Sequence, residues 1–128
     1  MRIARALLWL WLITFAAVGL TSAFFPHFIA ALVEISLPTD TARVDFMATY
    51  GGLELGLAGF LWTCTRKDEH VRLGLLASGW ALSGFALTRL LGILNSKAVQ
   101  PILYLLLLTE LMSAAFSFWA ARRAQLNS

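Results

Sequence analysis

The chain has 128 residues, of which 59% are apolar and 13% charged, and its formal net charge at pH 7 is +3. Its one cysteine, Cys64, excludes an intrachain disulfide, a CxxC redox pair and a thiolate metal cage within one chain. The basic residues lie at the ends of apolar runs, a pattern that favours membrane topology over nucleic-acid binding. The segments between these runs are too short to form a separate soluble domain.

Four apolar runs, each about 20 residues long, can cross a ~30 Å hydrocarbon core as helices. They occupy residues 6–25, 46–65, 73–94 and 99–121. The sequence therefore predicts an all-α fold, an integral membrane four-helix bundle that forms a single transmembrane domain over residues 1–128. Its first expected partner is the lipid bilayer.

The distribution of Lys and Arg predicts how this bundle is oriented. With four spans, one side of the membrane carries Arg2, Arg5, Arg66, Lys67, Arg72, Arg122 and Arg123, and the other carries only Arg43 and Lys97. Because cytoplasmic segments are enriched in basic residues, both termini are expected in the cytoplasm. The localisation predicted for this multi-pass protein is the cell (inner) membrane of a bacterium.

The first run has a second interpretation. Arg2 and Arg5, the apolar stretch after them and Thr21-Ser22-Ala23 resemble a cleavable signal peptide. The run of about 20 residues is longer than the roughly 7–15 residues of a signal core, so a retained transmembrane helix is favoured.

A short helix is predicted between the first two spans. Over residues 27–37, one side of the predicted helix carries Phe28, Ile29, Leu32 and Val33. This pattern is typical of a helix that lies in the outer interface of the membrane. Pro38 ends this segment, and the polar residues 39–41 offer N-caps for the next helix.

The second and third spans contain two kinds of stripe. Arg43, Met47, Tyr50 and Glu54 recur at i, i+4, i+7 and i+11, so they are expected on one helix face. Small residues at four-residue spacing allow close approach between membrane helices. The predicted helix-packing residues are Gly52, Gly56, Gly84 and Gly92.

Three of the spans carry a charge at membrane depth, namely Glu54, Arg89 and Glu110. Such a charge costs about 2.5 kcal/mol or more, so these residues are expected to pair. With both termini inside, Glu54 and Glu110 lie ~13 Å below the outer surface, within reach of Arg89. The predicted polar cluster, which binds a ligand or stabilises the fold, comprises Arg43, Asp45, Tyr50, Glu54, Arg89 and Glu110.

The charges of this cluster do not balance, because one guanidinium faces two membrane carboxyl groups. Either one carboxyl holds a proton or another cation joins. The cluster is therefore open to two interpretations, one in which it fixes the register of the helices and one in which it handles a ligand or a proton.

The stretch Thr41 to Leu57, which includes Tyr50-Gly51-Gly52-Leu53-Glu54, resembles the signature of a group of bacterial membrane proteins, domain of unknown function 4345. The segment Leu87 to Gly92 and the later Glu110 are similar to the arginine-glycine and glutamate motifs of that family. The resemblance runs nearly end to end and implies four helices without a known activity. Met47 stands where the family often has arginine, which puts any anion-binding role of that position in doubt.

The sequence argues against several kinds of chemistry. His27 and His70 lie at opposite ends of the predicted bundle, which argues against an intrachain bis-histidine haem. The sequence has no HExxH, GxSxG or phosphate-loop pattern, and no His/Cys set with metal-ligand spacing. No cofactor, metal site or catalytic residue is predicted.

The first functional hypothesis is an accessory or interaction subunit of a membrane complex, with a membrane-protein partner or a homo-oligomer and no nucleic acid. The alternative is a binder or carrier of a small anionic amphiphile, or a proton-coupled permease, with an outer-facing polar cavity. A membrane enzyme that uses Glu54 and Glu110 as acid and base is the third hypothesis.

Overall fold

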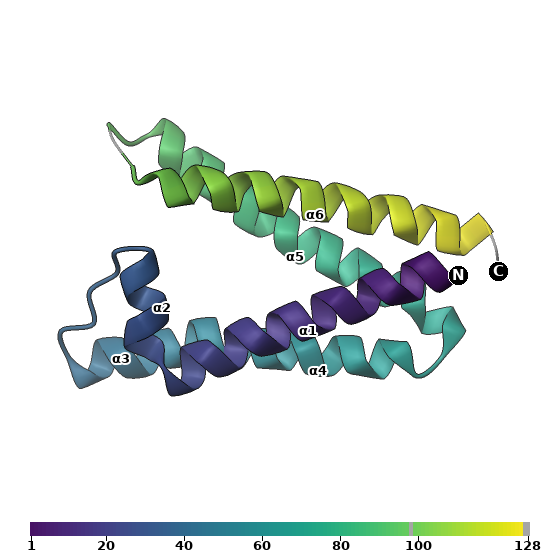
Figure 1. Ribbon diagram of the computed structural model, residues 1–128, viewed down its shortest axis with the longest axis horizontal. Helices are drawn as coiled ribbons and strands as arrows, with labels where there is room; N and C mark the ends of the chain where they lie inside the picture. The colour runs from purple at the N-terminus through teal and green to yellow at the C-terminus, as the bar shows by residue number, and fades with distance from the viewer. Residues whose placement is uncertain (98, 127–128) are drawn as a thin grey trace. The chain divides into compact units, whose positions relative to one another are not determined.

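The computed structural model describes residues 1–97 and 99–126, and these contain helices and no strand, which confirms the predicted all-α class. In chain order the elements are α1 (Arg2–Phe24), α2 (Pro26–Leu32), α3 (Asp40–Phe46), the π-helix η1 (Met47–Gly52), α4 (Leu53–Thr65), α5 (Asp68–Leu94) and α6 (Pro101–Leu126) (Figure 1). They form two compact units. The terminal unit contains Met1–Leu8 and the chain from Cys64 onward, and the middle unit contains Trp9–Thr63.

The predicted interfacial helix over residues 27–37 is shorter than expected. α2 begins at Pro26, where a missing N–H costs no hydrogen bond, and it ends at Leu32. Two residues later Glu34 has φ = 57°, in the left-handed region, and the Ile35 N–H donates to the Ala30 carbonyl at 2.9 Å. This left-handed turn ends the helix before the sequence pattern does.

The cap predicted before the second span is present. The Thr39 hydroxyl oxygen accepts a hydrogen bond from the Ala42 N–H at 3.1 Å and so starts α3. From Asp40 to Thr65 the chain stays helical, but it passes through η1 on the way.

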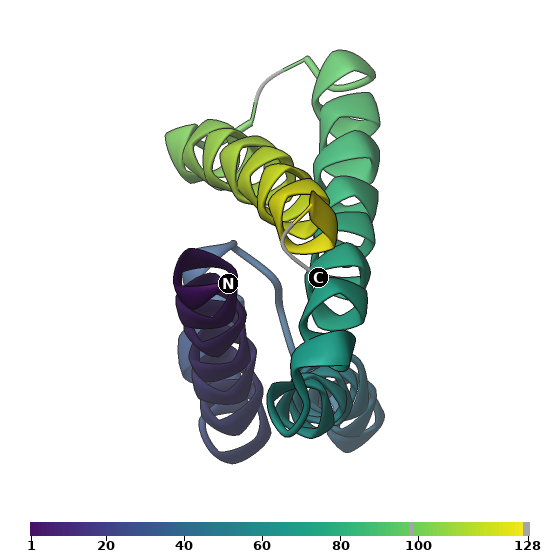
Figure 2. The ribbon, with the colours of Figure 1, turned by 90° about the vertical axis from the view of Figure 1, so that its right-hand side faces the viewer.

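The terminal unit is built on α5 and α6, which lie side by side as an antiparallel hairpin (Figure 2). Its interior is made largely of small side chains. On α6 the buried residues are Ala114, Ser117, Ala120, Ala121 and Ala124. Gly79 of α5 leaves room for the Phe118 ring, since a Cβ there would lie 2.9 Å from a ring carbon. The two helices therefore approach closely.

In the middle unit, α1 packs against η1 and α4. A Cβ on Gly19 would lie 3.0 Å from the Leu55 backbone nitrogen, and one on Gly51 would lie 3.1 Å from the Ala23 backbone. These two glycines thus lie where the helix backbones meet, and a Cβ at either position would crowd the neighbouring helix. Phe15, Ala58 and Leu61 are also buried.

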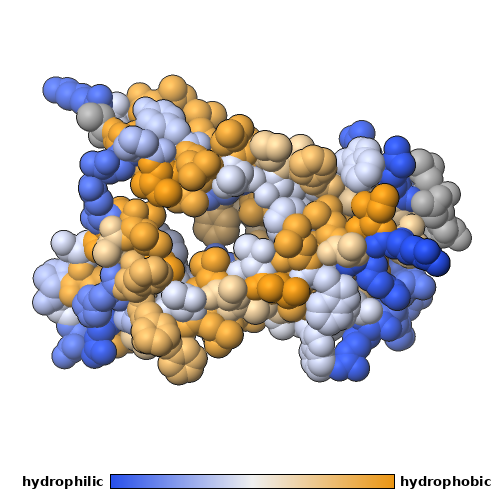
Figure 3. Space-filling model, in the orientation of Figure 1, coloured by the Kyte–Doolittle hydropathy of each residue, from blue (hydrophilic) through white to orange (hydrophobic). Residues whose placement is uncertain are grey.

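Three helices among the described residues are long and apolar enough to cross a membrane, namely Arg2–Phe24, Asp68–Leu94 and Pro101–Gln125. Apolar side chains cover much of α6 in the space-filling view (Figure 3). The predicted second span, residues 46–65, is helical but is not one uninterrupted α-helix, because α4 has only 13 residues and η1 precedes it.

Candidate functional site

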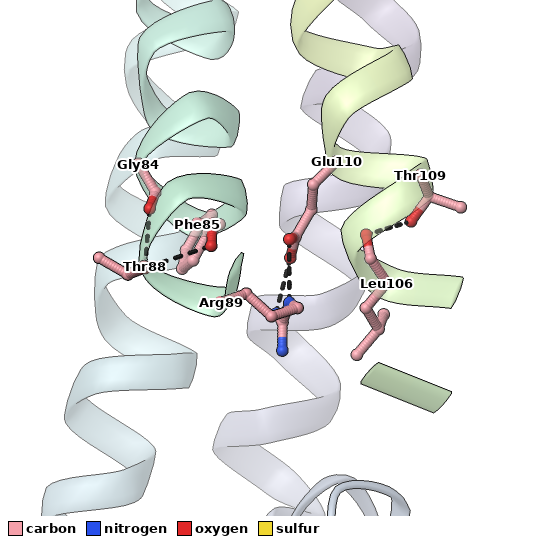
Figure 4. Close-up of polar contacts among 7 residues, drawn as sticks. All are labelled: Gly84, Phe85, Thr88, Arg89, Leu106, Thr109 and Glu110. Carbon is pink, nitrogen blue, oxygen red and sulfur yellow. Dashed lines mark hydrogen bonds and ion pairs between the residues drawn. The ribbon is translucent and has the colours of Figure 1, made fainter. Parts of the chain in front are cut away.

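Arg89 and Glu110 face each other across the α5–α6 hairpin. Arg89 lies about one and a half turns before the end of α5, and Glu110 lies about 13 Å along α6 from Pro101. Because the helices run antiparallel, these positions come to the same level. Figure 4 shows the two side chains pointing toward one another between the helices.

The pair is bidentate. The Arg89 Nε donates to Glu110 Oε2 at 2.9 Å, and an Arg89 terminal nitrogen donates to Oε1 at 2.7 Å. Two parallel hydrogen bonds of this kind use the planar fork of the guanidinium and are stronger than a single contact. The Arg89 side chain is 23% exposed and the Glu110 side chain 11%, so the ion pair is largely buried.

Nearby hydroxyl groups do not join this pair. Thr88 donates to the Gly84 carbonyl at 2.7 Å, and Thr109 donates to the Leu106 carbonyl at 2.8 Å (Figure 4). Each hydroxyl is thus satisfied by its own helix. The ion pair therefore carries the polar contact between α5 and α6 at this level.

Glu54 belongs to α4 in the middle unit and is 9% exposed. It lies against α1, where a Cβ on Gly19 would be 3.1 Å from the Glu54 Cβ. Ser22, about one turn after Gly19, is fully buried, and its hydroxyl has no hydrogen-bond partner in the described part of the chain. The predicted cluster is therefore found as a pair of Arg89 and Glu110, and the addition of Glu54 stays a prediction.

The predicted shared face of Arg43, Met47, Tyr50 and Glu54 is wrong. η1 replaces an α-helical turn between these residues, and a π-helical turn is wider, so the spacing of an α-helix does not apply across it. Arg43 and Tyr50 are exposed while Glu54 is buried.

The other residues assigned to the cluster have local contacts instead. Arg43 pairs with Asp40 at 3.0 Å rather than with Glu54. The Tyr50 ring stacks on Phe46 with centroids 4.5 Å apart, and among the described residues its hydroxyl makes no hydrogen bond to Glu54. Asp45 lines a shallow groove on α3 and η1 of about 470 Å³.

The glycines predicted to pack helices are not the ones at close approaches. Within its own unit, a Cβ added to Gly52, Gly56, Gly84 or Gly92 would meet no atom within 4 Å. The close approaches occur at Gly19, Gly51, Gly74 and Gly79. A four-residue spacing identifies a row of small residues but does not reveal which row faces a neighbour.

A search for metal ligands and comparisons with known proteins complete the description of the site. No set of three or more His, Cys, Asp or Glu residues that could hold a metal ion occurs within residues 1–97 and 99–126. The family model described as Domain of unknown function (DUF4345) matches residues 3–121 of this chain. No curated protein and no solved structure matches it.

Proposed function

The chain belongs to the Domain of unknown function (DUF4345) family, and on that premise we propose that it is an accessory subunit that binds other helices within a membrane complex. In this proposal it is a multi-pass protein of the inner membrane, a four-helix bundle with both termini in the cytoplasm. The partner is either another membrane protein or a second copy of the chain.

The distribution of charge supports the proposed topology. Arg2, Arg122 and Arg123 lie at the two ends of the chain, and Arg66, Lys67 and Arg72 lie around the turn from α4 to α5. Since basic residues mark the cytoplasmic side, this arrangement favours four crossings. The helical run Asp40–Thr65 is longer than the ~20 residues that a fourth crossing requires.

The observation that carries the proposal is the contrast between two sets of glycines. Gly19, Gly51, Gly74 and Gly79 are used by the chain itself, whereas Gly52 and Gly56, and likewise Gly84 and Gly92, leave open space within their own units. We call each of these last two pairs an open glycine row. Membrane helices commonly associate at rows of small residues of this kind. We assign these rows to a partner's helices.

The ion pair supports a structural role better than a carrier role. Binding of an anionic amphiphile at Arg89 would compete with two hydrogen bonds to Glu110. In the proposed function the pair fixes the α5–α6 hairpin, and Glu54 completes the cluster when the four helices assemble. The carrier, the permease and the enzyme remain the competing hypotheses.

The test is native mass spectrometry of the full chain, extracted gently from its own membrane. We expect a second polypeptide, or a second copy, at fixed stoichiometry. A bare chain that retains one specific anionic molecule, and loses it in Arg89→Gln, would overturn the proposal in favour of a carrier.

Matched variants locate the interface. Gly56→Leu and Gly84→Leu add bulk where the chain leaves space, so they should abolish the complex without lowering the melting temperature of the isolated protein. Ala115→Leu adds the same kind of bulk at an exposed position of α6 outside the glycine rows and should leave the complex intact. Equal loss in all three variants would contradict the assignment.

A further inference from the structure

A cavity with cationic walls lies in the terminal unit, between the start of α1 and the end of α6. It has a volume of about 290 Å³ and is lined by Met1, Arg2, Ile3, Ala4, Trp119, Ala120, Arg123 and Ala124. Ala4, Ala120 and Ala124 are buried, so small side chains form its inner wall. The cavity therefore combines an apolar floor with two guanidinium groups.

Its two arginines differ from Arg5 and Lys67, which have acidic neighbours. Arg5, on the same helix as Arg2, pairs with Asp68, and Lys67 lies 3.7 Å from Glu69. Neither Arg2 nor Arg123 has an acidic partner within the described ranges 1–97 and 99–126. The local acidic groups are thus engaged elsewhere, and the cavity retains its positive charge.

Trp119 positions one of these cations. The Arg123 guanidinium lies over the Trp119 ring, 4.6 Å from its centre, in a cation–π contact. Tryptophan is enriched at the level of lipid headgroups, where its ring contacts apolar groups and its N–H is hydrated. The contact therefore fixes Arg123 beside a residue type that is common at the headgroup level.

We propose that this cavity binds the headgroup of an anionic phospholipid. The phosphate lies between Arg2 and Arg123, and the glycerol and the first acyl carbons lie on the alanine floor. A phosphate diester accepts charge-assisted hydrogen bonds from both guanidinium groups, as basic pockets between membrane helices do for lipid headgroups. A zwitterionic choline headgroup would bring a third cation beside the two arginines and binds less well.

The site is independent of the proposed accessory role, because it uses residues at the end of the hairpin and none of the glycine rows. It also differs from the carrier hypothesis, which requires Arg89.

The experiment uses the full chain in nanodiscs made from equal parts of phosphatidylcholine and phosphatidylglycerol. Lipids retained after release into the gas phase are counted by native mass spectrometry. We expect one phosphatidylglycerol to be retained in preference to phosphatidylcholine. The double variant Arg2→Gln/Arg123→Gln should lower that retention roughly tenfold or more, since each basic group near a membrane surface contributes measurably to anionic lipid binding.

The control removes the same charge outside the cavity. Arg72→Gln/Arg122→Gln should retain phosphatidylglycerol within about twofold of the wild type, because neither side chain lines the cavity. A melting temperature like that of the wild type shows that each variant is folded. If the first double variant is unstable, Arg2→Lys/Arg123→Lys replaces it and should retain part of the binding. Equal losses in the two glutamine doubles would overturn the site in favour of diffuse attraction.

Inorganic phosphate in large excess distinguishes a lipid site from a phosphate site. We expect it to leave the bound phosphatidylglycerol in place, because the phosphate ion gains nothing from the alanine floor. Displacement by inorganic phosphate, or equal retention of phosphatidylcholine, would overturn the proposal.

Discussion

At the scale of single residues, the Arg89–Glu110 pair is a largely buried ion pair between the apolar stretches of α5 and α6. Both charges lose part of their hydration, and their attraction compensates for this loss only because the geometry is bidentate. The pair is therefore expected to be sensitive to the loss of either charge and tolerant of the loss of both.

Glu110→Gln should lower the stability of the folded protein by about 2 kcal/mol, because it removes the carboxylate from a largely enclosed guanidinium. The measurement is thermal unfolding of the purified protein in detergent. Arg89→Met/Glu110→Leu, which replaces both charges with apolar groups, should recover most of the loss. A double variant as unstable as Glu110→Gln would contradict this account.

Substitution by alanine should lower stability at a glycine that lies at a close approach of two helices and raise it at a glycine that faces open space. Gly19→Ala places a Cβ 2.9 Å from the Leu55 Cγ and 3.0 Å from its backbone nitrogen, so we expect a net destabilisation of about 1–3 kcal/mol. Gly56→Ala meets nothing within its unit and should stabilise the helix by up to about 1 kcal/mol. Melting temperatures of the two variants that move in the same direction would contradict the assignment.

Some of these residue contacts could be predicted from the sequence and others could not, because they are determined by different properties of the chain. The Arg89–Glu110 pair was predicted because two charges in apolar helices have few alternatives. The close-approach glycines could not be predicted, because the choice between Gly51 and Gly52 depends on a rotation of the helix that the sequence pattern does not contain.

At the scale of elements, the π-helix η1 is the main departure from expectation. The Leu53 N–H donates to the Ala48 carbonyl five residues earlier, which accommodates an extra residue in the helix. Gly51 then meets Ala23, and Glu54 turns toward Gly19. η1 also lies within the stretch that resembles the family signature, so the signature and the wide turn coincide.

Deleting Thr49 should convert η1 into an ordinary α-helical turn while preserving the orientation of α4 relative to α3. We expect a folded protein whose melting temperature falls by only a few degrees. Inserting one alanine after Thr49 should be far more damaging, because it rotates α3 by about 100° relative to α4. The comparison is made by thermal unfolding, and an insertion tolerated better than the deletion would show that η1 is not an inserted residue.

Three helices lie where the composition of the chain changes sharply from polar to apolar. Most of each predicted run 6–25, 73–94 and 99–121 lies in α1, α5 and α6. α1 and α5 begin four and five residues earlier than predicted, whereas α6 begins two residues later and ends at Leu126. The π-helix could not be predicted, because Met47–Gly52 reads equally well as α-helix and its distortion is stabilised by tertiary contacts. The early end of α2 has a similar cause, since no glycine marks the left-handed turn at Glu34.

At the scale of the whole molecule, the topology depends on whether the helical run Asp40–Thr65 crosses the membrane. Three helices qualify by length and hydropathy, and the run Asp40–Thr65 decides between three crossings and four. The two cases place the turn between α4 and α5 on opposite sides of the bilayer.

Single cysteines introduced into a Cys64→Ala background should report this directly. With four crossings and both termini inside, Ser36→Cys and Ser96→Cys react with a membrane-impermeant maleimide in intact cells. Lys67→Cys and Gln125→Cys react only after permeabilisation. Labelling of Lys67→Cys in intact cells would instead indicate three crossings.

The composition of the terminal unit has a consequence for the order in which the protein is assembled. Met1–Leu8 has its neighbours in the part of the chain that begins at Cys64, with Arg5 paired to Asp68 and Leu8 beside Gly74. During translation, at roughly 5–20 residues per second, the start of α1 leaves the ribosome seconds before those neighbours exist. Met1–Leu8 thus reaches its native contacts only after the chain from Cys64 onward has been translated, and until then it contacts other groups, such as lipid.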